Sequence, residues 1–153
     1  MQDKKIIAIR KATPDDAGVI IRFQQAMAME TERLELNTET VTKGVMAVFH
    51  DPKKGQYYVA EENNSVVASL MITYEWSDWR NAWLWWIQSV YVRPEARGKR
   101  VYSHLYDFVK TLAREKGVYG IRLYVEHDNY HAQRVYEKVG MEKSHYIMYE
   151  EML

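Results

Sequence analysis

The chain has 153 residues, of which 47% are hydrophobic and 27% charged, the size and composition of one globular domain. This composition disfavours disorder, collagen-like repeats and coiled coils. Its 21 basic and 21 acidic residues give a net charge of zero, so no overall field draws the protein to nucleic acid or to an anionic membrane. We therefore expect a single domain over residues 1–153, with neither nucleic acid nor a membrane as a partner.

Two absences in the sequence bear on location and chemistry. There is no cysteine, which removes disulfides, thiolate zinc sites and a cysteine nucleophile together. The first residues lack the apolar core of a signal peptide, and no stretch approaches the roughly 20 apolar residues that a membrane-spanning helix needs. These features predict a cytoplasmic protein.

The first third of the chain carries signals for a strand and two helices. Residues 5–10 are β-branched and partly alternating, as in a strand. Residues 13–16, Thr-Pro-Asp-Asp, supply a hydroxyl N-cap, a proline in the first turn and acids at the positive end of the dipole. That helix is expected to run to about residue 29. A second helix is expected over residues 38–50, because a segment with proline and glycine follows it.

The middle of the chain predicts three strands. Residues 57–61 and 66–74 flank two asparagines, which tolerate the left-handed backbone of a tight turn, so we predict an antiparallel hairpin. Residues 83–92 form an apolar and aromatic run interrupted by Gln88 and Ser89. Such a run is typical of a central strand covered on both faces.

The remaining elements alternate between helix and strand. Helical spacing of apolar residues appears over residues 101–112 and 132–139, and a glycine follows each helix. Strands are expected over residues 121–125 and 145–150. The order β-α-α-β-β-β-α-β-α-β predicts an α+β or mixed α/β fold, in which helices cover the faces of one sheet.

Residues 88–102 join the predicted central strand to a helix through a basic loop. The free N–H groups at a helix N-terminus carry about half a positive charge, so a pyrophosphate fits there. Arg97, Lys99 and Arg100 add charge, and Gly98 lets backbone approach a phosphate closely. A short glycine motif alone is weak evidence, and an ordinary basic loop is the alternative interpretation.

Two motifs, in this order and spacing, resemble those of the GNAT superfamily of acetyl-CoA-dependent N-acetyltransferases. The first is Val-x-Pro-x-x-Arg-Gly-Lys before a helix, at residues 92–99. The second is Asn-x-x-Ala-x-x-x-Tyr-x-x-x-Gly at residues 129–140, followed by Met141 where the family has phenylalanine. The resemblance covers essentially the whole chain. It implies acetyl-CoA as acyl donor and the GNAT fold, a mostly antiparallel twisted sheet with a parallel pair splayed at the cofactor site and helices on both faces.

The resemblance also implies roles for single residues. The central strand would splay at a bulge, so that its exposed backbone pairs with the pantetheine arm of the cofactor. Tyr136 would be the catalytic residue, its hydroxyl protonating the leaving thiolate, and its alternative is a packed helix aromatic. The expected cofactor-binding residues are Val90, Tyr91, Val92, Arg97, Gly98, Lys99, Arg100, Val101, Tyr102 and Asn129.

Two positions of the loop depart from the family pattern, which has small residues there. Arg100 replaces the second glycine. A positive φ at this position would strain the backbone of a non-glycine residue by on the order of 1 kcal/mol. Its side chain could, however, bind a phosphate. Tyr102 replaces the last small residue, and its larger side chain could narrow the site for the pyrophosphate. Weaker binding or a different acyl group therefore stays open.

The amine side of the reaction is less well marked. Acetyl transfer needs a group that accepts a proton from the amine. Many relatives place a carboxylate on the strand where this chain has Gln88. Water remains as a base, or one of the carboxylates of Glu30, Glu32, Glu75, Asp78 and Glu126. Each of these is alternatively a solvated surface acid.

All five tryptophans lie within residues 76–86. Their rings could line a pocket for the acceptor amine. Acids nearby would attract the positive charge of the amine, and the rings would offer it a cation–π contact. Core packing or a dimer contact explains the cluster equally well. The pattern Tyr-x-Trp-x-x-Trp resembles the diamine and thialysine acetyltransferase branch. The residues expected to bind the acceptor are Glu30, Glu75, Asp78, Trp85 and Gln88.

Three interpretations of function follow. The leading one is direct transfer from acetyl-CoA to a primary amine of a small molecule, and the alternatives are a peptide or protein N-acetyltransferase and a non-catalytic acyl-CoA-sensing module. No metal site is expected at His127, Asp128 and His131, because a further convincing ligand and a metal-enzyme motif are missing. A homodimer is possible by analogy with relatives.

Overall fold

The computed structural model describes residues 7–153. Residues 5 and 6 of the first predicted strand lie outside the described residues. The chain divides into two compact units, the first ending at Leu123 and the second spanning Tyr124–Leu153. The single domain over residues 1–153 therefore stays a prediction, and the sheet and the last helix belong to different units.

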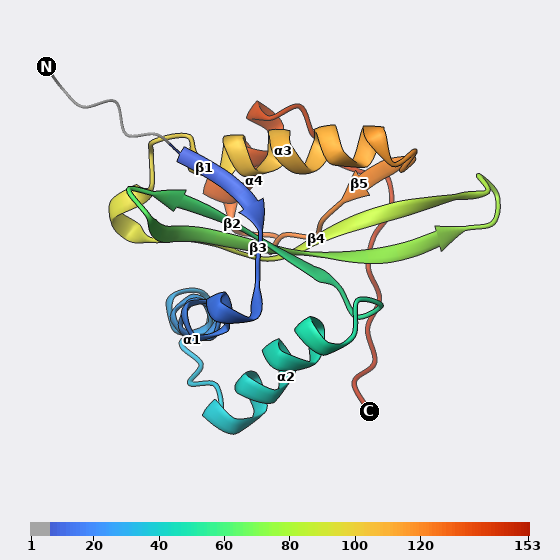
Figure 1. Cartoon of the computed structure of the whole chain (residues 1–153). Coiled ribbons are helices and arrows are strands. Elements are labelled where there is room, and N and C mark those ends of the chain that lie inside the picture. The colour runs from blue at the N-terminus through green and yellow to red at the C-terminus, as the bar shows by residue number, and fades with distance from the viewer. Residues whose placement is uncertain (1–6) are drawn as a thin grey trace, which may run out of the picture. The chain divides into compact units, whose positions relative to one another are not determined.

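The first unit is built on a five-stranded sheet in the order β1-β2-β3-β4-β5 (Figure 1). Neighbouring strands are antiparallel from β1 to β4, and β4 and β5 are parallel. All strands predicted up to residue 125 are confirmed, although the β3–β4 hairpin is longer than predicted and β5 is shorter. The strands are β1 (Ile7–Lys11), β2 (Gln56–Glu62), β3 (Ser65–Ser77), β4 (Ala82–Val92) and β5 (Gly120–Arg122).

Helices cover both faces of this sheet, as predicted. The helices α1 (Ala17–Glu32) and α2 (Thr38–His50) lie on one face, and α3 (Val101–Glu115) lies on the other (Figure 1). We name the two sides the α1/α2 face and the α3 face. Within residues 7–153, no helix has the length and apolar character needed to cross a bilayer.

Neighbouring residues of β2 show how the two faces are filled. Tyr57 lies 5.6 Å from Phe49 of α2, between ring centroids, whereas Tyr58 lies 5.8 Å from Phe108 of α3. This alternation is the period of two that a strand imposes. The core of the α1/α2 face consists of Ala12, Ala17, Ile20, Val45, Tyr57 and Val59.

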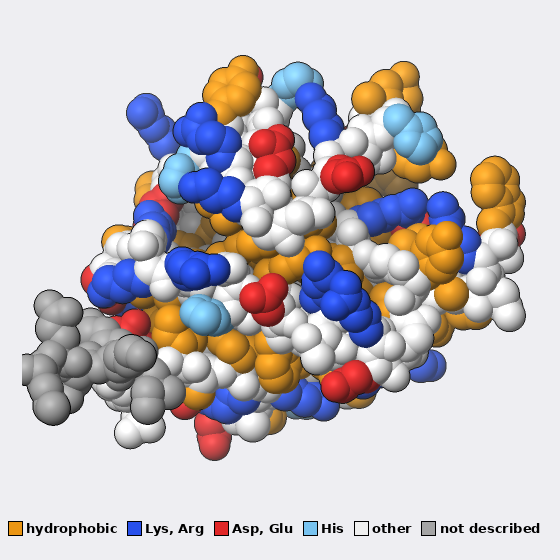
Figure 2. Space-filling view, turned by 90° about the horizontal axis from the view of Figure 1, so that it is seen from above, with side chains coloured by type: hydrophobic (Ala, Val, Ile, Leu, Met, Phe, Trp, Pro, Cys, Tyr) orange, Lys and Arg blue, Asp and Glu red, His pale blue; other side chains and the backbone are white. Residues whose placement is uncertain are grey.

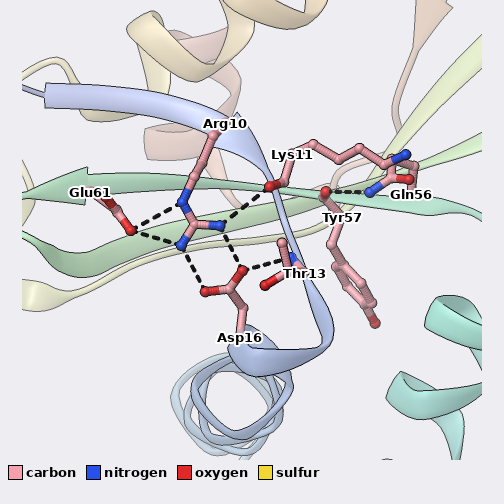
Figure 3. Close-up of polar contacts among 7 residues, drawn as sticks. All are labelled: Arg10, Lys11, Thr13, Asp16, Gln56, Tyr57 and Glu61. Carbon is pink, nitrogen blue, oxygen red and sulfur yellow. Dashed lines mark hydrogen bonds and ion pairs between the residues drawn. The ribbon is translucent and has the colours of Figure 1, made fainter.

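A buried ion pair sets the direction in which the chain leaves β1 for α1. Two nitrogens of the Arg10 guanidinium donate to the Asp16 carboxylate, at 2.7 and 2.8 Å, and one also donates to Glu61 of β2 at 2.7 Å (Figure 3). Asp16, which is only 6% exposed, also accepts the backbone N–H of Thr13. The Arg10 guanidinium holds the pKa of this carboxyl below its usual range. The cluster therefore joins β1, β2 and the start of α1.

The second unit contains one helix, α4 (Tyr130–Lys138), as predicted. The strand predicted over residues 145–150 is wrong, because residues 145–153 have no regular structure. A strand is stable only beside a backbone partner, and residues 124–153, all of them described, contain no other strand. The short apolar and aromatic run at residues 145–150 therefore has no strand beside it within this unit.

We expect Asp16→Asn to lower the free energy of unfolding by about 1–3 kcal/mol at neutral pH, because it weakens hydrogen bonds to a charged group in a buried position. Since the folded-state pKa of Asp16 is lowered, its stabilisation is present above the unfolded pKa of about 3.9 and is lost as the pH falls through the folded value. Denaturant unfolding from pH 7 to pH 2 measures both effects. The exposed neighbour provides the control, Asp15→Asn, for which we expect less than about 0.5 kcal/mol; equal losses in the two variants would contradict this role.

Candidate active site

The central strand carries a bulge at Ser89. Tyr91 of β4 is paired with Ser69 of β3, and Gln88 with Met71, so three steps along β4 match two steps along β3. The extra residue bends the strand, and Ser89 has the left-handed φ of 53°. This is the bulge that the family resemblance implies for the cofactor site.

The parallel pairing of β4 ends before this bulge. Within the described residues, β5 is paired only with the stretch of β4 from Leu84 to Trp86. Beyond Trp86, β4 continues to Val92 without β5 beside it. The backbone of residues 90–92, predicted to receive the pantetheine arm, lies on this stretch. In the first unit, its edge thus offers the backbone groups that an added strand would use.

The basic loop follows directly and leads into α3. Residues 97–100 are all exposed, and α3 begins at Val101. Gly98 and Arg100 have left-handed φ values of 75° and 63°, so the positive φ at position 100 is confirmed. The loop therefore brings Lys99 and Arg100 to the N-terminus of a 15-residue helix, the geometry that suits a bound phosphate.

Tyr102 does not obstruct the surface of this loop. The residue is 8% exposed, and its ring centroid lies 6.2 Å from that of Tyr106 on the next turn of α3. Val101 is also buried, at 2% exposure. Both side chains belong to the packing of α3, so the two residues would present only backbone to a ligand in the loop.

Arg97 is hydrogen-bonded to two protein groups. Its Nε donates to the carbonyl of Val92 at 2.9 Å, and its Nη2 donates to Glu30 of α1 at 2.7 Å. The other oxygen of the Glu30 carboxylate accepts the hydroxyl of Tyr91 at 3.2 Å. Burial and the Glu30 carboxylate raise the pKa of Tyr91. Glu30, predicted on the acceptor side, thus contacts two of the residues predicted to bind the cofactor.

A second set of polar contacts lies on the α1/α2 face of β3, β4 and β5. Gln88 donates through its Nε2 to Thr73 at 2.7 Å. Glu75 accepts the indole N–H of Trp86 at 2.8 Å and the guanidinium of Arg122 at 3.1 Å. We call these five residues the polar row. Sequence reasoning missed Thr73 and Arg122, because only the strand register brings them beside Gln88 and Glu75.

Trp85 and Asp78 lie away from the polar row. Trp85 is 6% exposed and packs on the α3 face, with its ring centroid 6.3 Å from that of Tyr74. Asp78 lies in the turn of the β3–β4 hairpin, before the start of β4 at Ala82. At about 3.3 Å per residue, this turn is roughly 20 Å from Gln88. The structure therefore brings Glu75 and Gln88 into one row but separates them from the other two residues.

The tryptophans divide between core and surface. Trp76 and Trp83 are each 49% exposed and lie 5.1 Å apart, between ring centroids, and Trp79 in the turn is 90% exposed. Figure 2 shows hydrophobic side chains at this end of the hairpin, to the right of the view. Trp86 alone among them joins the polar row, so the cluster does not form one acceptor pocket.

Two buried polar atoms on the α1/α2 side were also missed. The Nε2 of Gln24 on α1 and the Oγ of Ser69 on β3 find no hydrogen-bond partner among the described residues. Ser69 faces Tyr91 in the register, and Phe23, next to Gln24, lies 4.9 Å from the Tyr91 ring, between centroids. Buried polar atoms of this kind are suited to contact a bound polar group. A glutamine inside a helix gives no such signal in the sequence.

The second unit holds the remaining predicted residues. The side chain of Asn129 caps α4 by accepting the backbone N–H of Ala132 at 3.1 Å. Burial raises the pKa of Tyr136. His127 and His131 are exposed, and residues 7–153 contain no group of three or more His, Cys, Asp or Glu that could hold a metal ion.

Comparison with known proteins identifies the family. The model of the acetyltransferase (GNAT) family matches residues 24–141. The aminoalkylphosphonate N-acetyltransferase of Salmonella typhimurium is 26% identical over 141 residues, which cover 92% of this chain and 88% of that protein.

Solved structures agree with this assignment. A possible acetyltransferase from Clostridium difficile 630 is 43% identical, with a TM-score of 0.90 over 97% of this chain and 99% of that one. A predicted acetyltransferase from Clostridium acetobutylicum, solved with acetyl-CoA, has the same fold, with a TM-score of 0.77 and 20% identity over 95% of this chain and 96% of that one. The chain belongs to the GNAT family of acetyltransferases, which use acetyl-CoA as the acyl donor.

Proposed function

We propose that this protein transfers the acetyl group of acetyl-CoA directly to a primary amine of a small molecule. The observation that carries the proposal is the end of β4, where a bulge at Ser89 and an edge not paired with β5 lead into the exposed basic loop. An extended pantetheine arm fits such an edge as an added strand. A pyrophosphate fits the loop that follows it.

The donor would be held mainly by backbone. The arm would pair with residues 90–92, and the pyrophosphate would accept N–H groups of residues 98–102 at the start of α3. Lys99 and Arg100, both exposed, would add positive charge at the phosphates. Val101 and Tyr102 would contribute only their N–H groups, since their side chains are buried. In the second unit, Asn129 would contact the pantetheine region.

Transfer would occur in one step within a ternary complex. The amine nitrogen attacks the thioester carbonyl, the carbon–sulfur bond breaks, and the sulfur leaves with its electron pair. A backbone N–H near Tyr91 would stabilise the oxyanion. Tyr136 would protonate the leaving thiolate, and its raised pKa keeps its hydroxyl protonated at neutral pH, as this role requires.

The proton of the attacking amine would go to water. The amide of Gln88 is no base, and the carboxylate of Glu75 is paired with Arg122 and Trp86. Glu30 is held by Arg97 and Tyr91. Of the predicted carboxylates, Asp78 lies in the distant hairpin turn. A proton relay through water is therefore better supported than a role as base for Glu30, Glu75 or Asp78.

The polar row supports an acceptor other than a diamine. A diamine keeps a second positive charge, which requires an uncompensated acid, but Arg122 neutralises Glu75. The Salmonella typhimurium relative is named for aminoalkylphosphonates, which are small amines with an anionic group. We therefore favour a small amine whose other end is neutral or anionic, over both diamines and peptide N-termini.

Oligomeric state and location stay proposals. The exposed rings of Trp76, Trp79 and Trp83 support a homodimer contact at the hairpin end, because exposed aromatic clusters often mark interfaces. A cytoplasmic location is supported only by the absence of cysteine.

Acetyl-CoA at about a hundred times its Kd should stabilise the fold by roughly 2.7 kcal/mol, which differential scanning calorimetry detects. A thiol-release assay then compares aminoalkylphosphonates, amino acids, diamines and peptides, and the protein adds no thiol background because it has no cysteine. We expect the fastest release with small zwitterionic or anionic amines. No stabilisation at millimolar acetyl-CoA would refute the proposal, and stabilisation without any thiol release would favour the acyl-CoA sensor.

Replacing Tyr136 by phenylalanine should lower kcat at least about tenfold while acetyl-CoA still binds, because the general acid is lost. The exposed Tyr130 on the same helix supplies the matched control, Tyr130→Phe, with kcat expected to be unchanged. Steady-state kinetics and calorimetry measure the two quantities. Equal kcat in the two variants would remove Tyr136 from the chemistry.

Arg100 allows strain to be separated from charge. Arg100→Gly should raise the free energy of unfolding by up to about 1 kcal/mol, since glycine adopts the φ of 63° without a Cβ penalty. Arg100→Ala keeps the strained backbone and should show no such gain. Both variants lose one positive charge and should bind acetyl-CoA more weakly to a similar degree. Unchanged affinity in both would remove Arg100 from the phosphate site.

A further inference from the structure

The last turn of α1 is joined to the donor loop through the carboxylate of Glu30. We propose that Glu30 is a positioning residue for acetyl-CoA: it holds Arg97 and Tyr91 so that the loop and the bulged end of β4 keep the conformation that binds the donor. We call Glu30, Tyr91 and Arg97 the clasp. This inference rests on the proposed function, because it assigns a role in binding the same donor.

The side chain of Arg97 is folded back against the end of β4. Its Nε donates to the Val92 carbonyl at 2.9 Å, and its Nη2 donates to Glu30 at 2.7 Å. The guanidinium carbon also lies 5.5 Å from the centre of the Tyr91 ring, within the range of a cation–π contact. Three contacts fix the direction of this side chain, so it anchors the first residue of the loop instead of extending toward a phosphate.

Glu30 connects this arginine to the strand. One carboxylate oxygen accepts Arg97, and the other accepts the hydroxyl of Tyr91 at 3.2 Å. Tyr91 is 7% exposed and packs against Phe23 of the same helix, so its hydroxyl is well fixed. The carboxylate is therefore held between an immobile tyrosine and the start of the loop.

The position of Glu30 in the helix supports a use beyond helix stability. A negative charge in the last turn of a helix interacts unfavourably with the helix dipole. The last turn of α1 contains no basic residue, so the charge of Glu30 is compensated by Arg97 of the donor loop. The carboxylate of Glu30 is thus unfavourably placed for the dipole of its own helix and is stabilised by its contacts with Arg97 and Tyr91.

The clasp acts on the donor through the loop that begins at Arg97. The loop needs left-handed backbone at Gly98 and Arg100, an arrangement that depends on both of its ends being held. The C-terminal end of the loop is held by the buried side chains of Val101 and Tyr102. Its N-terminal end is held by Arg97, and without Glu30 this end loses its charged partner. The expected consequence is weaker binding of the pyrophosphate, with the acceptor site unaffected.

The test compares two exposed carboxylates at the C-terminal end of α1. Glu30→Gln keeps the size of the side chain and removes its charge, and Glu35→Gln makes the same change at a residue just after the helix. In Glu30→Gln we expect the Kd of CoA and the KM of acetyl-CoA to rise about three- to tenfold, a modest effect because the ion pair is partly exposed. Its kcat and the KM of the amine should stay within about twofold of wild type, and Glu35→Gln should match wild type throughout.

A truncated donor separates positioning of the loop from contact with the acceptor. S-acetylpantetheine carries the thioester arm without the pyrophosphate, so the penalty of Glu30→Gln should shrink to less than about twofold with this donor. If Glu30 binds the amine instead, the KM of the amine rises with both donors, and the proposal is overturned. Equal penalties with both donors would overturn it as well.

Further variants distinguish a loss of the clasp from a general loss of folding. Tyr91→Phe removes one hydroxyl and should weaken CoA binding in the same direction by a smaller factor. Arg97→Gln should give a penalty that does not add to that of Glu30→Gln, because the two side chains act through one contact; full additivity would contradict the clasp. If wild type fails to bind CoA, the proposed function and the clasp both fall. If wild type binds CoA and Glu30→Gln behaves like Glu35→Gln, only the clasp is refuted.

Discussion

The site proposed for acetyl-CoA depends on one constraint: β4 is longer than the strand that runs parallel to it. The pairing with β5 ends at Trp86, and the bulge at Ser89 follows. A strand edge without a partner is normally a liability, because its backbone groups invite pairing with another chain. Here the stretch of β4 beyond β5 is short and stays paired with β3. It ends in a basic loop, so the two together match a ligand with an extended arm and a pyrophosphate.

The two faces of β4 carry different kinds of side-chain contact. The α3 face supplies packing, with Trp85 and Tyr102 buried, and so fixes the helix whose N-terminus would receive the phosphates. The α1/α2 face carries polar contacts in two groups, the clasp near Tyr91 and the polar row around Gln88 and Glu75. The bulge lies between these groups. Donor loop and acceptor side are therefore connected through a single strand and the end of α1.

Much of the fold could be predicted from the sequence, because its signals are local. The N-terminal signals at residues 13–16, the asparagine turn between β2 and β3 and the basic loop before α3 each act over a few residues, and the elements they predict are present. The strand over residues 145–150 failed for the opposite reason. A strand depends on a partner elsewhere in the chain, and a short apolar and aromatic run does not reveal whether that partner exists.

The basic loop before α3 and its backbone conformation were predictable, whereas the contacts around it were not. The family motif points to residues 92–99, and the positive φ of Arg100 follows from the glycine that the family has there. By contrast, the pairing of Glu30 with Arg97 spans 67 residues, and that of Glu75 with Arg122 spans 47. Acids and arginines are common on surfaces, so no local pattern tells which of them meet. This is why the acceptor residues predicted from the sequence are divided among different parts of the structure.

The central claim is that the edge of β4 beyond its pairing with β5, and the loop after it, bind acetyl-CoA. Amide hydrogen exchange with and without saturating acetyl-CoA tests it most directly, since it reports on the backbone groups themselves. The account predicts slower exchange over residues 88–92 and 97–102, with the hairpin turn at residues 78–81 unchanged as an internal reference. Binding of acetyl-CoA without slower exchange in either segment would contradict it.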